Sequence, residues 1–568
     1  MAIHYPKEQY HRIQYTKLTP EQILAKLDGA KPTSASELSD GLAGKRIKIV
    51  LDDGPTLEYN FHNGDELSLT ENSGAPARGG YGALQLKNLV LVSHMVPGTQ
   101  KGYQVIIDQS NNLATVFEVW FSGFEDNREV QRQYYFGYVD TGGTAPTERH
   151  HTTNRMEGKG LYWKLDNDIE ILEFYPSVRY SSFVELTRLG GELMFCGPSD
   201  YVRINDHQYI YSRTECEFSG IFTLQVTDLF DVTHTGVRLG FNDTDALEYY
   251  LYRGKGEITG QLATFQKFGD DGEKLSGPEH PEKGYRNVYR PLRTFPRMTA
   301  DEVAKAVDEN QNLFTATGGM AGNVPPLSDA LVGIQMMVRY DDGHAWEFRF
   351  DSDKLLQWRD EVTATWQQQP YQAYEAAEDL YVIAHWRKGT RPAEAAIVVL
   401  DLANSLTTMV DSHAGTPYFA NEVSQVIRTG VIERDGIVPP KYRRQRITDE
   451  LVGHVFTWNY EEGLTSMHLY GTPRSASWII FQPDGNGGSE WSSPANYVAL
   501  RDDCYLFTWI EEACNGSQGT IVFNTRTMHD VGFGFHVGPD GISINPVGAL
   551  ARKAGEFDIK KYFGPKQA

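Results

Sequence analysis

Residues 38–61 of the chain read LSDGLAGKRIKIVLDDGPTLEYNF, and residues 327–350 read LSDALVGIQMMVRYDDGHAWEFRF. The two stretches align without a gap. A second pair aligns equally well at nearly the same offset, YVRINDHQYIYSRTE at 201–215 and YVALRDDCYLFTWIE at 497–511. Two collinear matches indicate a tandem duplication, with halves of about 285 residues in a chain of 568.

A short helix is expected ahead of each repeated stretch. LTPEQILAKLD carries Thr19 and Gln22 in the spacing of a capping box, and MTADEVAKAVD carries Thr299 and Glu302 in the same spacing. Each half is therefore predicted to begin with a helical arm.

A weaker repeat lies within each half, so that the whole chain contains four units. Each unit starts with a glycine, continues with an apolar strand and reaches an acidic turn; the four glycines are Gly44, Gly158, Gly333 and Gly453. Further along each unit another expected strand ends on a polar residue. These residues are, in chain order, His94, Glu215, His385 and Glu511.

Alternation along a strand places residues two apart on the same face. The strand that leads to Glu511 therefore carries an aromatic face, and the matching strand before Glu215 carries a similar one. In a β-barrel these faces are expected to point into the lumen. The first set is Tyr505, Phe507 and Trp509 with Glu511, and the second is Tyr209, Tyr211 and Arg213 with Glu215.

These repeats predict an all-β protein of four small antiparallel β-barrels. The 12% aromatic content and frequent glycine favour strands and turns, and the chain length also favours about four domains. The expected units are a helical arm at 1–35, barrels at 36–150 and 151–265, a linker and helical arm at 266–320, and barrels at 321–445 and 446–568.

The charge of the chain limits its partners. The formal net charge is -22, the isoelectric point is near 5.2, and no basic stripe occurs. Nucleic acid and anionic membrane surfaces are therefore not expected as partners, since both require clustered Lys and Arg. No apolar segment of eighteen residues and no apolar region near the N-terminus is present, so a cytoplasmic location is expected.

Cofactor motifs are absent from the sequence. Cys196, Cys216, Cys504 and Cys514 are scattered, which favours buried free thiols over a disulfide framework or a zinc site. No phosphate-binding loop, dinucleotide fingerprint or nucleophile elbow occurs. The sequence therefore predicts a protein that works without a metal or another cofactor.

Glu215 and Glu511 are candidate acid or base groups. A carboxylate on an aromatic face is costly to ionise, so its pKa should rise toward neutrality. The alternative is that each ends its strand at the barrel mouth and only accepts hydrogen bonds from neighbouring amides.

His94 and His385 are further catalytic candidates because imidazole titrates near neutrality. Metal binding by these histidines is not expected, since no second ligand stands at a suitable spacing. The alternative is a hydrogen-bonded histidine in each lumen.

Two more pairs occupy equivalent positions in the two halves. Arg179 and Arg474 are candidates to hold a substrate carboxylate, with a solvent-facing arginine at a strand end as the alternative. Trp163 and Trp458 each follow their unit's glycine by five residues, and either stack on a ligand or fill the barrel floor.

The segments GHVFTWNYEEGLTSMHLY and YVALRDDCYLFTWIEE resemble the small cofactor-independent phenolic acid decarboxylases, which have calycin-type barrels. The resemblance implies that Tyr460 holds the substrate carboxylate and that Trp458 stands in place of a second tyrosine. It also implies that Glu511 handles the phenol-side proton. The family's arginine would fall near Glu490.

The paired architecture also resembles the molybdenum cofactor biosynthesis protein F (MoaF) family, which is calycin-like. Together the two resemblances imply four calycin or lipocalin-like barrels. The expected function is cofactor-independent lyase chemistry, such as decarboxylation, on a small aromatic or phenolic acid. Two alternatives stay open, a binding protein for small aromatic ligands and an isomerase or hydratase that uses His94 and His385. A monomer or a homodimer is expected.

Overall fold

We describe the protein from a computed structural model. The description covers residues 18–122, 127–187, 191–215, 220–242, 244–263, 297–315, 319–391, 393–416, 419–481, 490–511 and 516–564. Four eight-stranded antiparallel barrels occur in these residues, and each closes because its first and last strands pair. The all-β prediction of tandem calycin-like barrels is confirmed.

The outer barrel of each half consists of eight strands and has no extra strand. Barrel 1 consists of β2 (Arg46–Leu51), β3 (Thr56–Phe61), β4 (Glu66–Glu71), β5 (Ala77–Leu86), β6 (Leu89–Met95), β7 (Lys101–Asp108), β8 (Leu113–Phe121) and β9 (Val130–Val139). Barrel 3 consists of β19 (Gln335–Tyr340), β20 (Ala345–Phe350), β21 (Leu355–Asp360), β22 (Gln367–Ala377), β23 (Leu380–Arg387), β24 (Glu394–Asp401), β25 (Leu406–Ala414) and β26 (Val423–Glu433).

The inner barrel of each half has one or two short extra strands. Barrel 2 consists of β11 (Lys159–Leu165), β12 (Glu170–Phe174), β13 (Tyr180–Glu185), β14 (Met194–Arg203), β15 (Gln208–Thr214), β16 (Ile221–Asp228), β17 (Thr233–Phe241) and β18 (Leu247–Gln261), with β1 (Thr33–Ser34) on β18 and β10 (His151–Thr152) on β14. Barrel 4 consists of β28 (His454–Glu461), β29 (Leu464–Leu469), β30 (Ser475–Phe481), β31 (Glu490–Arg501), β32 (Cys504–Ile510), β33 (Ser517–Asn524), β34 (His529–Gly538) and β35 (Gly541–Glu556), with β27 (Arg446–Ile447) on β31.

The repeated glycine has the same backbone role in all four barrels. Its φ is positive, +75° at Gly44, +83° at Gly158, +82° at Gly333 and +91° at Gly453. Side chains rarely tolerate this region, and glycine enters it freely. Each glycine N–H then donates to a carbonyl at or just beyond the end of its barrel's second strand, as Gly44 does to Phe61 (2.8 Å), so the glycine starts the first hairpin of each barrel.

The two predicted helical arms are α2 (Pro20–Leu27) and α4 (Ala300–Glu309). Both begin with a complete capping box, built by Thr19 with Gln22 and by Thr299 with Glu302. The buried face of α4, with Val303 and Val307, packs into the apolar cluster between barrels 3 and 4. A short 3-10 helix, η2 (Lys560–Tyr562), follows the last strand.

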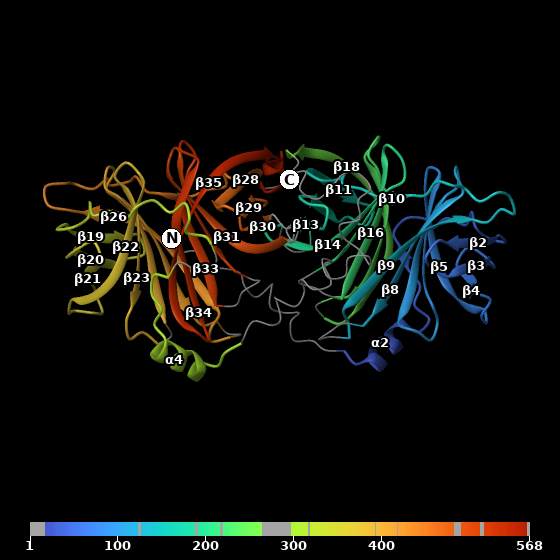
Figure 1. Cartoon of the computed structure of the whole chain (residues 1–568), viewed down its shortest axis with the longest axis horizontal. Coiled ribbons are helices and arrows are strands. Elements are labelled where there is room, and N and C mark those ends of the chain that lie inside the picture. Colours follow the sequence, from blue (N-terminus) through green and yellow to red (C-terminus); the bar gives the residue numbers. More distant parts are fainter. Residues whose placement is uncertain are drawn as a thin grey trace.

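The barrels lie in the spatial order 1, 2, 4, 3, so the two inner barrels meet at the centre of the molecule (Figure 1). Apolar clusters fill each of the three junctions. The central junction joins Phe174 and Val184 of barrel 2 to Met467 and Phe557 of the second half. Apolar contacts therefore join each of the four barrels to its neighbour in this order.

The lumen and the outer wall of a barrel are built from alternating residues of the same strand. On β32, Tyr505 and Phe507 belong to the aromatic cluster inside barrel 4, whereas Cys504 and Leu506 belong to the junction with barrel 3. The buried free thiols of Cys196 and Cys504 agree with the sequence prediction. Cys216 and Cys514 lie outside the described residues.

Candidate functional site

Barrel 4 encloses a cavity of about 370 Å³. Its wall is mostly aromatic and aliphatic, with a small number of polar side chains, which is typical of small-molecule sites. The lining residues are Met320, Tyr460, Leu464, Ser466, His468, Trp478, Ile480, Trp491, Trp509, Glu511, Ser517, Gln518, Gly519, Gly534, Phe535, His536, Asn545 and Val547.

Stacked aromatic pairs give this cavity flat walls. The rings of Trp478 and Trp491 stack with centroids 4.8 Å apart and an interplanar angle of 23°. The ring of Trp509 stacks on Phe507 at the same distance and 18°. Flat rings of this kind favour a planar ligand that can pack against them face to face.

Two glycines keep the cavity open. Trp509, Gly519, Gly534 and Asn545 lie in one row across β32, β33, β34 and β35. A side chain at Gly519 would collide with the Trp509 indole, so glycine there lets the indole lie across the next strand. A Cβ at Gly534 would meet nothing closer than 3.6 Å, so its absence leaves volume in the lumen.

The same row in barrel 2 carries large charged side chains. Ladder pairing places Arg213, Thr223, Arg238 and Tyr250 in the positions of the four barrel 4 residues. Arg213 therefore stands in place of Trp509, and Arg238 stands in place of Gly534. The two inner barrels share one fold but differ in what fills the lumen.

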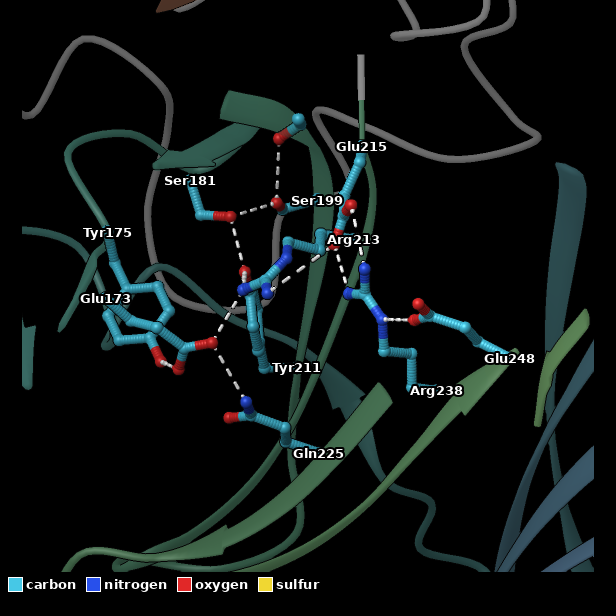
Figure 2. Close-up of polar contacts among 11 residues, drawn as sticks. Glu173, Tyr175, Ser181, Ser199, Tyr211, Arg213, Glu215, Gln225, Arg238 and Glu248 are labelled. Atoms are coloured by element: carbon cyan, nitrogen blue, oxygen red, sulfur yellow. Dashed lines mark hydrogen bonds and ion pairs between the residues drawn. The ribbon is translucent and has the colours of Figure 1, made fainter. Parts of the chain in front are cut away.

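An ion-pair network occupies the barrel 2 lumen (Figure 2). Nη1 of Arg213 lies 2.6 Å from Oε1 of Glu173, which also accepts from Gln225 at 2.9 Å. Arg238 pairs with Glu215 through both of its terminal nitrogens and with Glu248 through Nε at 2.6 Å. These charged groups pair with one another across the described part of this lumen.

Glu215 therefore has surroundings that differ from the expected aromatic face. Its carboxylate is buried and lies between Arg238 and Arg213, whose Nη2 is 3.9 Å away. The expectation of an aromatic environment is wrong for Glu215, because the arginine that approaches it comes from β17, a strand whose pairing the repeat alone does not reveal. Its contacts are those of a structural ion pair.

Glu511 is the equivalent residue of barrel 4 and lines the cavity. Its Oε1 accepts a hydrogen bond from Nε1 of Trp509 at 2.5 Å. The side chain is half-buried at the end of β32, directly after the aromatic face that the sequence predicts. Glu511 and Trp509 are thus brought together at the edge of the cavity.

Burial shifts the pKa values of the other titratable groups of the barrel 4 lumen toward their neutral forms. Burial lowers the pKa of His468 to about 3. Burial also raises the pKa of Tyr460, with smaller effects from the carboxyl groups of Asp530 and Glu511. Burial raises the pKa of Asp530 well above its usual value. His536, whose pKa burial lowers, is hydrogen-bonded to Ser517 at 2.5 Å.

His94 and His385 lie in the lumens of barrels 1 and 3 and are fully buried. Nε2 of His94 is 3.2 Å from the Tyr59 hydroxyl, which fits the expected hydrogen-bonded histidine. The equivalent of Tyr59 in barrel 3 is Phe348, so both ring nitrogens of His385 lack a hydrogen-bond partner. Burial lowers the pKa of His94 to about 4 and that of His385 to about 3.

The two candidate arginines do not line the cavity. Arg179 is buried, and burial lowers its pKa, so the solvent-facing alternative is wrong for it. Arg474 is half-buried and donates to Oδ1 of Asn496 at 3.1 Å, and its Nε lies 4.0 Å from Glu192 of barrel 2. Arg474 therefore lies where the two inner barrels meet.

Most other candidate residues fill the barrels. Trp163 and Trp458 are fully buried, and Trp458 packs on Phe523 with centroids 4.6 Å apart. The hydroxyls of the three candidate tyrosines outside the cavity are hydrogen-bonded within the protein. Tyr505 donates to Glu450 at 2.8 Å, Tyr209 donates to the Asp206 carbonyl at 3.1 Å, and Tyr211 bonds Ser181 at 2.5 Å.

The structure thus brings together three of the predicted residues, Tyr460, Trp509 and Glu511, in one cavity. Sequence reasoning missed His468, Trp478 and other lining residues, which lie outside the matched stretches at 327–350 and 497–511. If the alignment of 201–215 with 497–511 is extended by one hairpin, Arg238 aligns with Gly534. This difference is a sequence signal that the two lumens differ.

Within the described residues, no group of three or more His, Cys, Asp or Glu side chains is placed to hold a metal ion. No helix in that part of the chain has the length and apolar character needed to cross a membrane.

The fold and the cavity define a tandem calycin-like barrel protein with a lumen suited to a small molecule. Comparison with protein families places the MoaF N-terminal domain at residues 312–416 and the MoaF C-terminal domain at residues 445–556. Residues 312–416 and 445–556 are therefore MoaF-like, and barrel 4, with its cavity, lies in the C-terminal domain. No curated protein matches the chain. The resemblance to phenolic acid decarboxylases stays a prediction.

Proposed function

We propose that barrel 4 binds a small, flat aromatic molecule, with Glu511 accepting a hydrogen bond from the ligand. The observation that carries this proposal is the cavity of about 370 Å³ between the Trp478–Trp491 stack and Trp509, with Glu511 on its wall. Planar walls supply contact area, and a small number of polar groups fix the orientation of a ligand.

The polar groups of the cavity favour a ligand that carries a hydroxyl or an N–H group. A carboxylate accepts hydrogen bonds and repels another carboxylate, and the described lining contains no Lys or Arg. Ser517 and His536 lie on the same wall as Glu511 and add further polar contacts. The family name connects MoaF domains with molybdenum cofactor biosynthesis. We therefore propose that the ligand is an intermediate of such a pathway.

A cofactor-independent lyase activity is the second candidate, supported by the presence of Tyr460 and Glu511 in one cavity. In a decarboxylation, the bond to the carboxyl carbon breaks, carbon dioxide leaves and a proton takes its place. A protonated tyrosine or glutamic acid on the cavity wall can deliver that proton. The contacts of His94 and His385 add no support for an isomerase or hydratase, because both rings are enclosed by their barrels.

Isothermal titration calorimetry with 2-naphthol tests the binding proposal, because this probe is flat, neutral and carries one hydroxyl donor. Saturable binding to the intact chain supports the proposal. The lyase candidate is tested by incubation with 4-hydroxycinnamic acid and measurement of released carbon dioxide. Absence of release with intact 2-naphthol binding would leave binding alone as the function.

A further inference from the structure

A row of polar side chains borders the aromatic row of the barrel 4 cavity. It lies two residues from that row on each strand and consists of Glu511, Ser517, His536 and Ser543. Ladder pairing joins Ser517 to His536, and the Glu511 N–H donates to the Ser517 carbonyl at 3.1 Å. Glu511, Ser517 and His536 line the cavity and are half-buried. A molecule in the cavity can therefore reach a carboxylate, a hydroxyl and an imidazole.

Ser517 and His536 form a hydrogen-bonded pair. The Ser517 Oγ lies 2.5 Å from Nδ1 of His536. The ordinary pKa of a histidine is about 6.5, and burial lowers the pKa of His536 further, so the ring is mainly neutral at pH 7. The neutral tautomer with its proton on Nε2 accepts the serine proton at Nδ1. A serine hydroxyl bound to a neutral imidazole has the arrangement of an activated nucleophile and its general base.

Glycine at position 538 leaves room for the His536 ring. Gly538 lies two residues further along the same face of β34, and a Cβ there would meet Nε2 of His536 at 2.5 Å. Asp540 follows in the turn after β34, and its charge favours the protonated imidazole, against the larger effect of burial on the pKa of His536. When Nδ1 takes the serine proton, the imidazolium therefore has a counter-charge in Asp540.

The equivalent row of barrel 2 holds no such pair. Ile221 and Gly240 stand in the positions of Ser517 and His536, and they are also ladder partners. The backbone is the same in both barrels, because the Glu215 N–H donates to the Ile221 carbonyl, again at 3.1 Å. The barrel fold therefore requires neither the serine nor the histidine, and the pair lies in the inner barrel whose lumen holds the aromatic cavity.

We propose that Ser517 is a nucleophile and His536 its general base, and that barrel 4 hydrolyses small aromatic esters whose ring lies in the cavity. The inference goes beyond the proposed binding function and rests on it, because the aromatic part of the ester must occupy the same lumen. The ring packs against the Trp509 row, and the ester carbonyl lies at the neighbouring polar row. An ester is uncharged, which suits a cavity whose described lining contains no Lys or Arg.

The reaction proceeds through an acyl-serine. Oγ of Ser517 forms a bond to the ester carbonyl carbon while its proton passes to Nδ1 of His536. The bond from that carbon to the leaving oxygen then breaks, and the imidazolium gives the proton to the leaving alcohol or phenol. Water, deprotonated by His536, attacks the acyl carbon, releases the acid and restores Ser517. Asn545 also lines the cavity, and its amide N–H group is a donor of the kind that stabilises the oxyanion.

Hydrolysis of 2-naphthyl acetate by the intact chain tests the proposal, because the released 2-naphthol is fluorescent and is also the binding probe. Ser517→Ala and His536→Ala should each lower the rate roughly 100-fold or more. The double variant should lose little more than the larger single loss, because the two groups act as a unit. The matched control is Ser543→Ala, which should keep the rate, since Ser543 is the other ladder partner of His536 and is not among the described lining residues.

Covalent labelling of the unchanged protein gives a second measurement that does not depend on the folding of a variant. Phenylmethanesulfonyl fluoride is an aromatic reagent that forms a stable ester with activated serines. Oγ bonds to its sulfur and fluoride leaves. We expect mass spectrometry of the peptides to find the label on Ser517, together with loss of hydrolysis.

Four outcomes would overturn the proposal. Hydrolysis that persists in folded Ser517→Ala would exclude Ser517 as the nucleophile, and so would a label found only on other residues. If the unchanged protein binds 2-naphthol in calorimetry but does not hydrolyse its acetate, the esterase fails and the binding function stands. If folded protein neither binds 2-naphthol nor hydrolyses the acetate, both fail.

Discussion

Nε1 of Trp509 donates a 2.5 Å hydrogen bond to Oε1 of Glu511, and the equivalent pair in barrel 2 is Arg213 and Glu215. One position therefore carries an indole in one inner barrel and a guanidinium in the other. In barrel 4, Gly534 lies in the same row as the Trp509 indole, and the lumen holds an open aromatic cavity. In barrel 2, Arg238 lies in the same row as Arg213, and both guanidinium groups belong to an ion-pair network (Figure 2). The duplicated fold thus supports one lumen with an aromatic cavity and one lumen that holds an ion-pair network.

Replacement of Glu511 by glutamine separates a catalytic role from a structural one. Glutamine keeps the shape and the hydrogen-bond acceptor but cannot transfer a proton. If the lyase candidate is correct, turnover of the phenolic acid should fall roughly 100-fold, the usual worth of one general acid or base, with the melting temperature retained. Turnover and melting temperature measured on the same Glu511→Gln sample decide this. An unchanged rate together with a lowered melting temperature would reject catalysis by Glu511.

Removal of Arg238 should destabilise barrel 2 strongly. Arg238→Met leaves the buried Glu215 and the partly buried Glu248 without this guanidinium, and the loss of one partner of a buried ion pair costs about 3 to 5 kcal/mol. The free energy of unfolding in urea measures the effect. The control is Arg78→Met, which removes an exposed pair with Glu66 and should cost less than about 1 kcal/mol. Similar losses in both variants would show that the barrel 2 network adds no particular stability.

The two lumen histidines should respond oppositely to substitution by phenylalanine. His385→Phe removes two unpartnered ring nitrogens and should leave stability at pH 7 unchanged or raised. His94→Phe removes the hydrogen bond to Tyr59 and leaves that buried hydroxyl unpaired, at a cost of about 1 to 3 kcal/mol. Thermal melts of the two variants at pH 7 make the comparison. Equal destabilisation would contradict the assigned contacts.

The same histidines predict an acid sensitivity. The pKa of His385 is lowered to about 3 in the folded state, so the unfolded chain binds the proton more readily. This contribution to stability is fully present above the usual histidine pKa of about 6.5 and is lost as the pH falls from there toward 3. His385→Phe should therefore lose less melting temperature than the unchanged protein between pH 7 and pH 4. Parallel pH profiles would show that the pKa of His385 is the same in the folded and unfolded states.

Most of the fold could be predicted from the repeats. The glycine at the start of each barrel and the acidic turn after the first strand are local features, so they can be recognised in the sequence. Gly44 and Gly453 show in the sequence where a hairpin must begin, and the structure gives both a positive φ. Strand ends such as Glu215 and Glu511 were visible for the same reason.

The difference between the inner barrels could not be predicted in the same way. Whether a lumen is hollow depends on side chains that meet across strands far apart in the sequence, as Arg213 meets Glu173 and Arg238 meets Glu215. The match at 201–215 ends before Arg238 and Gly534, where the two barrels diverge. A polar residue on an aromatic face was therefore predictable, and the charge that approaches it from another strand was not.

Closure of the barrel 4 cavity tests the central claim most directly. A Cβ at Gly534 has space, with its nearest neighbour at 3.6 Å, so Gly534→Leu should fold and place a large side chain in the lumen, at the position that Arg238 occupies in barrel 2. Isothermal titration calorimetry with 2-naphthol should show saturable binding to the unchanged protein. In Gly534→Leu the affinity should fall at least about 10-fold, or below detection, with an equal or higher melting temperature. Equal affinity of the two proteins for 2-naphthol would contradict the assignment of the barrel 4 lumen as the ligand site.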